Sequence, residues 1–341
     1  MSAYIISYSE TLPTFFKSKK VSQLKNTSFT AGFVKADVNS PFMPKRSDLK
    51  IMREDIAVSI IDIKKMLSKL NLSENELEKT GLFIANGSFL DQPEKHLDRI
   101  PEIFKLFTAD MSDEDKKKLI YQKIPPLLAL ETLTNSSMSF IAQYTKIKGH
   151  NTTFGNTSIS GTFGVKQSVV EVENNLSNMV LCGGANCGDT YSFLCNSPLF
   201  ENIENWKESA AVGNLLIKTN LSNNETPLAK ISQVKINSKI PNLSHQKTER
   251  MWRQILPKHP ADLVIFSGAF TDKDYELDKQ YLNSCTNQTF SFFNEYGNLG
   301  AANIVLGIIK GIKQLSYQTK IIDIIDRDVY GRESLVRIEK C

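Results

Sequence analysis

Short runs of apolar and β-branched residues alternate along this chain with segments in which apolar residues recur at helical spacing. The short runs predict β-strands at residues 3–8, 81–86, 179–184, 214–219, 262–268 and 334–338. Apolar residues three or four positions apart predict helices over residues 55–70, 126–144, 165–176 and 304–312. Strands that alternate with helices are typical of α/β proteins, in which helices cover a buried sheet. Residues 220–249 are rich in Asn, Ser and Lys, and we expect them to lie on the surface, outside the core.

The length of 341 residues is enough for one large core or for two domains of ordinary size. No repeat in the period range of solenoid proteins is visible. A boundary between two halves is expected near residues 195–225, and we divide the chain into residues 1–200 and residues 201–341.

Composition and charge exclude several classes of protein. Lys and Arg number 41 against 37 Asp and Glu, a net charge of +4 without a basic block, so the sequence does not predict nucleic-acid binding. The start of the chain lacks a basic region followed by a long apolar stretch, so no signal peptide is expected. The longest apolar stretches, such as residues 302–312, are too short to span a bilayer. Five cysteines, an odd count without an export signal, favour reduced thiols and a cytoplasmic protein.

Residues 156–165, "NTSISGTFGV", hold the most informative local pattern. They predict a small-residue turn that follows a short strand and opens into a helix, and a strand ending in Gly183 and Gly184 comes next. Gly161 and Gly164 permit close approach at the start of the helix, where the N–H groups of the first turn stabilise negative charge. Ser158 in the turn is therefore a candidate nucleophile. The other interpretation is a structural serine that hydrogen-bonds to the helix start.

Two further patterns do not predict a site. Cys182, Cys187 and Cys195 contain no CxxC pair and have no histidine near them, so no metal site is expected. Cys182 follows an apolar run and is expected in the core. The segment "GGANCG" at residues 183–188 lacks the spacing of a nucleotide-binding loop and is interpreted as a close-packed turn.

Residues 125–187 resemble the nucleophile region of β-ketoacyl synthases, proteins of the thiolase fold. The matching features are Asn135, "KGHN" at 148–151, "TSISG" at 157–161 and the Gly183–Gly184 pair. Weaker matches are residues 208–217, 297–303 and 330–338. The resemblance implies a thiolase-like α/β fold with α-β-α-β-α layers and two pseudo-duplicated halves. It implies no cofactor bound by this chain, and phosphopantetheine-linked acyl chains of a carrier protein as the substrate of the complex.

The resemblance places four different residues at the positions where a ketosynthase carries its catalytic groups. Ser158 stands at the nucleophilic cysteine, Gly268 at the first histidine, Phe293 at the lysine and Asn298 at the second histidine. No catalytic residue is therefore expected. This pattern is similar to chain-length factors, the inactive subunits that pair with an active ketosynthase in type II polyketide synthases. The resemblance implies a heterodimer, an acyl carrier protein as partner, and an aromatic or aryl-polyene type of product.

Two alternatives stay open at this point. Many chain-length factors carry Gln at the nucleophile position, so Ser158 also fits a serine-dependent acyltransferase or acyl-carrier hydrolase of the same fold. The second alternative is a homodimeric scaffold that takes no part in chain elongation. Phe104 and Phe107 are candidates for the wall of a substrate channel, or else ordinary core aromatics. The resemblance implies that the strand before the turn lies in the dimer interface, with Thr152, Thr153, Phe154, Gly155 and Asn156.

Overall fold

The structure is a computed structural model. It describes residues 2–20, 28–87, 109–123, 135–155, 157–188, 206–222, 225–238, 259–268, 289–328 and 332–341, with a few single residues between them. The strands predicted at residues 3–8, 81–86, 179–184 and 334–338 are all present. The helices predicted over residues 55–70, 165–176 and 304–312 are present at residues 54–67, 160–173 and 303–314.

Hydrogen bonding joins most of the described strands into one continuous order. Within it, each half of the chain contributes five strands in an equivalent arrangement. The first half contributes, in spatial order, β5 (Asn151–Gly155), β4 (Gly81–Asn86), β6 (Met179–Cys187), β7 (Lys207–Lys218) and β1 (Ala3–Thr11). The second contributes β10 (Thr289–Ser291), β9 (Leu263–Phe266), β11 (Ile321–Arg327), β12 (Arg332–Glu339) and β8 (Ala229–Ser238).

The two orders also agree in strand direction. In each half the first two pairings from the outer edge are parallel and the next two are antiparallel, and β1 pairs with β8 where the halves meet. This is the pseudo-duplication predicted from the sequence. The order favours a changeover between β7 and β8, within residues 219–228, rather than at residue 200. A hairpin of β2 (Phe15–Lys20) and β3 (Ser28–Phe33) adds to the start of β7.

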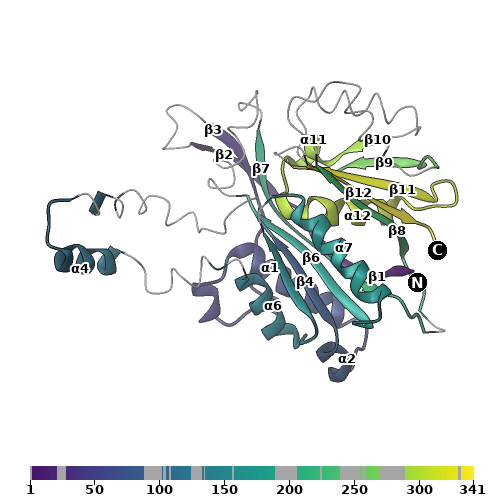
Figure 1. Ribbon diagram of the computed structural model, residues 1–341, viewed down its shortest axis with the longest axis horizontal. Helices are drawn as coiled ribbons and strands as arrows, with labels where there is room; N and C mark the ends of the chain where they lie inside the picture. The colour runs from purple at the N-terminus through teal and green to yellow at the C-terminus, as the bar shows by residue number, and fades with distance from the viewer. Residues whose placement is uncertain are drawn as a thin grey trace.

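Two helices lie between the strands of the two halves (Figure 1), α7 (Ser160–Glu173) and α12 (Asn303–Gln314). The outer face of the first half is covered by α1 (Glu54–Leu67) and α6 (Ser136–Thr145). The shorter elements are α2 (Glu74–Glu78), α4 (Asp113–Lys123), α11 (Phe292–Tyr296), η1 (Asp48–Lys50) and η5 (Gly300–Ala302). Within the part of the chain that is described, no helix combines the length and apolar character needed to cross a membrane.

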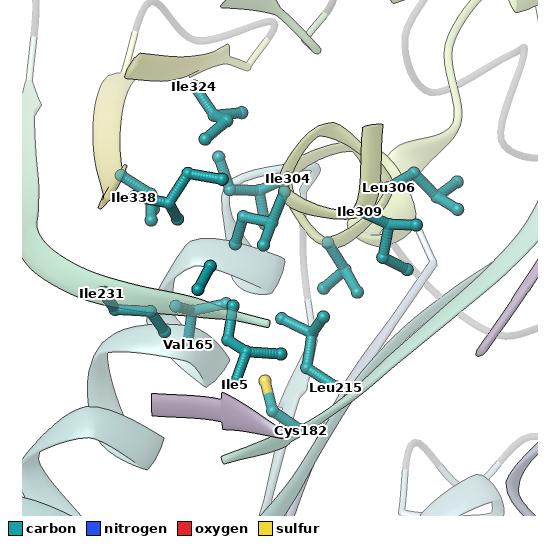
Figure 2. Close-up of a cluster of buried hydrophobic side chains, with 14 of the residues drawn as sticks. Ile5, Val165, Cys182, Leu215, Ile231, Ile304, Leu306, Ile309, Ile324 and Ile338 are labelled. Atoms are coloured by element: carbon teal, nitrogen blue, oxygen red, sulfur yellow. The ribbon is translucent and has the colours of Figure 1, made fainter. Parts of the chain in front are cut away.

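The main core forms around α12 and α7, where side chains from both halves meet (Figure 2). Ile304 and Ile309 of α12 are fully buried against Ile324 of β11 and Leu215 of β7. Cys182 points into the same core from β6, as expected. The α12 sequence explains this, because its apolar residues Ile304, Val305, Leu306, Ile308 and Ile309 are all buried against side chains from strands of both halves.

Two expectations about the fold were wrong. The segment at residues 183–188 was interpreted as a close-packed turn, but residues 183–187 continue strand β6 and pair with β7. The second expectation concerns the polar stretch. Residues 229–238 lie in the polar stretch assigned to the surface, but they form β8, an inner strand that pairs with β1 and β12. Ala229 and Ile231 are buried and alternate with polar residues. This period of two is a strand signal that the polar composition of the wider segment hid.

Candidate functional site

The candidate site lies at the start of α7, in the turn that follows β5. Ser158 is buried there, and its Oγ donates a hydrogen bond to the main-chain oxygen of Arg327, 3.2 Å away. Ile159 precedes the first helical residue and makes no side-chain cap. The turn is thus held by contacts with the second half of the chain, where β11 ends.

A charged cluster from the β11–β12 connection fixes the residue before Ser158. Thr157 Oγ1 donates to Asp328 Oδ2 over 2.7 Å and accepts from Arg332 Nη2 over 2.5 Å. Arg332 Nε donates to the same Asp328 oxygen over 2.5 Å, and the Arg332 main-chain N–H donates to Asp328 Oδ1 over 2.9 Å. We call Thr157, Asp328 and Arg332 the turn clamp. Charge-assisted bonds of this kind are stronger than neutral ones, so the clamp holds the turn rigidly.

Next to the clamp, β11 and β12 carry a second buried ion pair, between Arg327 and Glu333. Asp326, the residue before Arg327, is fully buried, and no side chain among the described residues donates a hydrogen bond to its carboxylate oxygens. Burial raises the pKa of Asp326 well above its ordinary value, and the charge of Asp328 adds to the effect. The region beside Ser158 is therefore dense in buried charge.

Gly268, which follows β9, lies against the same stretch of β11. A Cβ atom at Gly268 would overlap the main-chain nitrogen of Arg327 and Oδ1 of Asp326. The structure thus brings two of the sequence-predicted positions, Ser158 and Gly268, against the main chain of one residue, Arg327. Space for an imidazole at position 268 is taken by strand β11 itself.

Asn298 lies at the start of the loop that leads into α12, and it is the centre of another buried network. Its Nδ2 donates to both carboxylate oxygens of Glu208, at 3.1 and 3.0 Å. Glu208 also accepts from Trp206 Nε1 over 3.0 Å. The Asn298 Oδ1 atom accepts from the main-chain N–H of Gly300 over 3.1 Å. The side chain of Asn298 is therefore used on both its donor and its acceptor sides in holding β7 to the loop.

The starts of α7 and α12 meet, which brings the Ser158 and Asn298 loops to the same end of the layers. A Cβ atom at Gly161 in the first turn of α7 would overlap the main-chain oxygen of Ala301, just before α12, and the same oxygen blocks a Cβ atom at Gly184. At both positions the close approach of another backbone requires glycine. Both glycines belong to the motif from which the site was predicted.

Several predicted site residues fall outside the described part of the chain. These are Asn156, Phe104 and Phe107, together with the side chain of Phe293, whose backbone lies in α11. Of the predicted interface strand, Thr152, Thr153, Phe154 and Gly155 form β5, which pairs only with β4 among the described strands.

Neither described histidine lies near Ser158. His150 Nδ1 contacts the Glu171 carboxylate at 2.6 Å, and Glu171 is about 20 Å along α7 from Ser158 at 1.5 Å per residue. His259 lies beside Arg337, at the opposite end of β11 from Arg327. The thiol of Cys182 is no substitute nucleophile, because burial raises its pKa to about 12. Within the described residues no cluster of His, Cys, Asp and Glu is arranged to hold a metal ion.

Sequence reasoning missed the charged residues of the site, chiefly Asp326, Asp328, Arg332 and Glu208. A signal existed for the two aspartates. Residues 321–325 form a β-branched run of strand type, and the charged segment "DRD" follows it directly. Glu208 carried no comparable signal, because an isolated carboxylate in an otherwise apolar strand shows its partners only once the strands are paired.

Similarity to known proteins is found at the level of the fold, among solved structures. No protein-family profile matches the sequence, and no curated protein matches it either. Among solved structures, the chain is similar to the ketosynthase of a type II polyketide synthase in complex with its acyl-carrier protein and bound to the hexaketide. That match has a TM-score of 0.73 and 12% identity and covers 100% of this chain and 99% of the other.

Two further structures show the same similarity. The ishigamide ketosynthase/chain length factor matches with a TM-score of 0.73, 12% identity and coverage of 100% of this chain and 99% of that one. A β-ketoacyl synthase from Burkholderia phymatum matches with a TM-score of 0.74, 10% identity and the same coverage. The chain therefore has the thiolase-like fold of ketosynthases and of a ketosynthase/chain length factor, over its whole length, as the sequence resemblance predicted.

Proposed function

We propose that this chain is a catalytically silent ketosynthase-like subunit. It pairs with an active ketosynthase and helps to set the length of a polyketide chain that is carried by an acyl carrier protein. The observation that carries the proposal is the hydrogen bond from Ser158 Oγ to the main-chain oxygen of Arg327. A hydroxyl becomes a nucleophile when a base takes its proton, and a main-chain carbonyl is not a base.

The other predicted catalytic positions support the same proposal. At Gly268 strand β11 leaves no room for a side chain, and Asn298 is committed to Glu208 and Gly300. Neither position offers a proton acceptor to the start of α7. A chain built in this way keeps the shape of a ketosynthase while its own site does not turn over.

The position of strand β5 supports the proposal of a partner subunit. Asn151, Thr152 and Gly155 are exposed, and among the described strands β5 ends the sheet order on its side. An open edge strand presents unpaired N–H and C=O groups that favour pairing with another strand. The ketosynthase of the complex would add its own strand there. The phosphopantetheine-linked acyl chain would then belong to the complex as substrate, and this chain would bind no cofactor of its own.

Phe104 and Phe107 stay our candidates for the channel wall. Replacing either with Ala should lengthen the product if its side chain limits the channel. Unchanged product length in both variants would remove the two residues from the channel.

The experiment that tests the function is the native mass of this chain co-expressed with the ketosynthase encoded nearest to it. A 1:1 complex, or a multiple of it, that forms product only when both chains are present would support the proposal. A homodimer that ignores the ketosynthase would contradict it. In that case covalent acyl mass on Ser158 after incubation with acyl carrier protein would favour the serine-dependent acyltransferase or hydrolase, and its absence would favour the scaffold.

A further inference from the structure

Positive charge is concentrated in the segment that contains the β2–β3 hairpin. Residues 11–36 contain five lysines and no arginine, aspartate or glutamate, which is more positive charge than the net +4 of the whole chain. The carboxylates that flank this segment, Glu10 and Asp37, contact Lys313 and Lys65 instead. The hairpin segment therefore carries a local positive charge that its neighbours in the chain do not neutralise.

Two of these lysines lie around one aromatic ring. The Nζ atom of Lys17 is 5.5 Å from the centroid of the Phe15 ring, and that of Lys35 is 5.4 Å from the same centroid. Phe33 stacks on Phe15 with 5.1 Å between the centroids and so holds the ring in place. Both lysines are exposed, and neither forms an ion pair with a described residue. Two ammonium groups held near one ring without a counter-ion favour an anionic partner. We call Phe15, Lys17 and Lys35 the hairpin surface.

Protection of an open sheet edge explains only part of this arrangement. Among the described strands β2 pairs with β3 alone, and lysines on an edge strand discourage pairing with other chains. This accounts for Lys17, which lies in β2. It does not account for Lys35, which follows β3 and still lies over the ring of Phe15. The second lysine is therefore the one that points to binding.

The hairpin lies close to the loop that carries Asn298. β3 runs along the start of β7 and pairs with Lys207, Glu208 and Ser209 (Figure 1). The main-chain N–H of Ser209 donates to the main-chain oxygen of Asn298 over 2.9 Å, and its Oγ donates to the main-chain oxygen of Tyr296 over 2.5 Å. A protein bound to the hairpin would therefore lie near the end of the layers where the Ser158 and Asn298 loops meet.

The charge and its position select an acidic protein as the occupant. Two lysines around one ring match a few carboxylates better than the long phosphate backbone of a nucleic acid, which needs a larger basic surface. Acyl carrier proteins have acidic surfaces, and in the proposed function the carrier has to deliver its acyl chain to this end of the complex.

We propose that the hairpin surface docks the acyl carrier protein, with Lys17 and Lys35 binding acidic side chains of the carrier. The inference rests on the proposed function and adds the surface of this chain that the carrier contacts. A carrier bound there contacts the silent subunit while its acyl chain is extended at the site of the ketosynthase.

The test uses the complex of this chain with the ketosynthase encoded nearest to it. Calorimetric titration with the carrier protein in its apo form, without phosphopantetheine, measures the contribution of side chains alone. The double variant Lys17→Glu/Lys35→Glu should raise the Kd by about tenfold or more, and Lys17→Met/Lys35→Met by less. The Kd of the wild type should also depend more steeply on salt than that of either variant.

Lys340→Glu is the matched control. Lys340 is exposed and follows the far end of β12, so the substitution should leave the Kd for the carrier unchanged. Both lysines of the hairpin surface are exposed, so the double variants should still co-purify with the ketosynthase, which separates a docking defect from misfolding.

Three results would overturn the inference. Equal Kd values for the wild type and Lys17→Glu/Lys35→Glu, in a complex that still forms product, would show that the carrier docks elsewhere while the proposed function stands. Vesicles of anionic phospholipid that bind the wild type and not the double variant, with no difference toward the carrier, would assign the surface to a membrane. A wild-type complex that forms no product with the loaded carrier would overturn the proposed function, and this inference with it.

Discussion

The hydroxyl of Ser158 and the carbonyl of Arg327 are joined by a hydrogen bond of 3.2 Å, although the two residues are 169 positions apart in the chain. Ser158 precedes the helix of the first half and Arg327 ends a strand of the second half. The bond therefore ties the two pseudo-duplicated halves together at the position that the resemblance assigns to the nucleophile. In the proposed function this hydroxyl contributes to the structure and does not react.

Restoring the family nucleophile should not restore the reaction. Ser158→Cys supplies a thiol, but proton transfer still requires the bases that Gly268 and Asn298 do not provide. We expect no condensation product from the Ser158→Cys chain alone with acyl- and malonyl-loaded carrier protein, measured by mass spectrometry. Ser158→Ala gives the background and an active ketosynthase the positive control. Product above the Ser158→Ala background would sink this prediction.

The turn clamp should contribute to stability. Arg332→Ala leaves the buried Asp328 carboxylate without its charged partner and removes a donor from Thr157. The Arg332 side chain is 27% exposed, so we expect a loss in the free energy of unfolding of about 2–4 kcal/mol, below that of a fully buried pair. Urea unfolding measures it. Arg46→Ala is the matched control, because Arg46 is exposed, and it should change stability by less than about 0.5 kcal/mol. Equal stabilities of the two variants would show that the clamp is not stabilising.

Asn298 should behave as a structural residue. Asn298→Ala removes the amide that donates to both oxygens of the buried Glu208 carboxylate. We expect a loss of about 2–4 kcal/mol in the free energy of unfolding, because bonds to charged groups are costly to leave unmade. Asn294→Ala, at an exposed position four residues earlier, is the control. Asn298→His should be destabilised as well and gain no activity, and a stable variant that condenses acyl chains would refute this assignment.

Asp326 should make the protein less stable as the pH rises. Its pKa in the folded state is raised above the ordinary value of 3.8, first by burial and then by the charge of Asp328. The folded chain therefore holds the proton more tightly than the unfolded chain. The stability that this provides is present below the ordinary pKa and is lost as the pH rises from there through the raised pKa.

The corresponding variant is Asp326→Asn, which stays neutral at every pH. Its stability should depend less on pH than that of the wild type between pH 4 and the raised pKa, and at neutral pH it should be at least as stable as the wild type. Chemical denaturation in a series of buffers measures this. Asp110→Asn, at an exposed position, should leave the pH profile unchanged. Parallel profiles for wild type and Asp326→Asn would show that Asp326 does not titrate as inferred.

Local pattern alone determined a large part of the fold. The strand at Gly81–Asn86 and the helix at Glu54–Leu67 follow directly from an apolar run and from apolar spacing, because side-chain periodicity is a property of the segment itself. The turn before α7 was also visible, because the glycines at positions 161 and 184 are needed where backbones approach closely. The resemblance carried by this motif was enough to predict the thiolase-like fold.

Tertiary structure decided what surrounds the turn. Ser158 could be placed before a helix from the sequence, but its bond to Arg327 depends on how the two halves pack. The same is true of β8, whose polar composition suggested the surface until its pairing with β1 and β12 placed it between the halves. Propensity and periodicity are local quantities, whereas a partner far away in the chain is selected by the packing of the whole core. For that reason the motif could be recognised in the sequence, but the assembly of the charged residues into the turn clamp beside Ser158 could not.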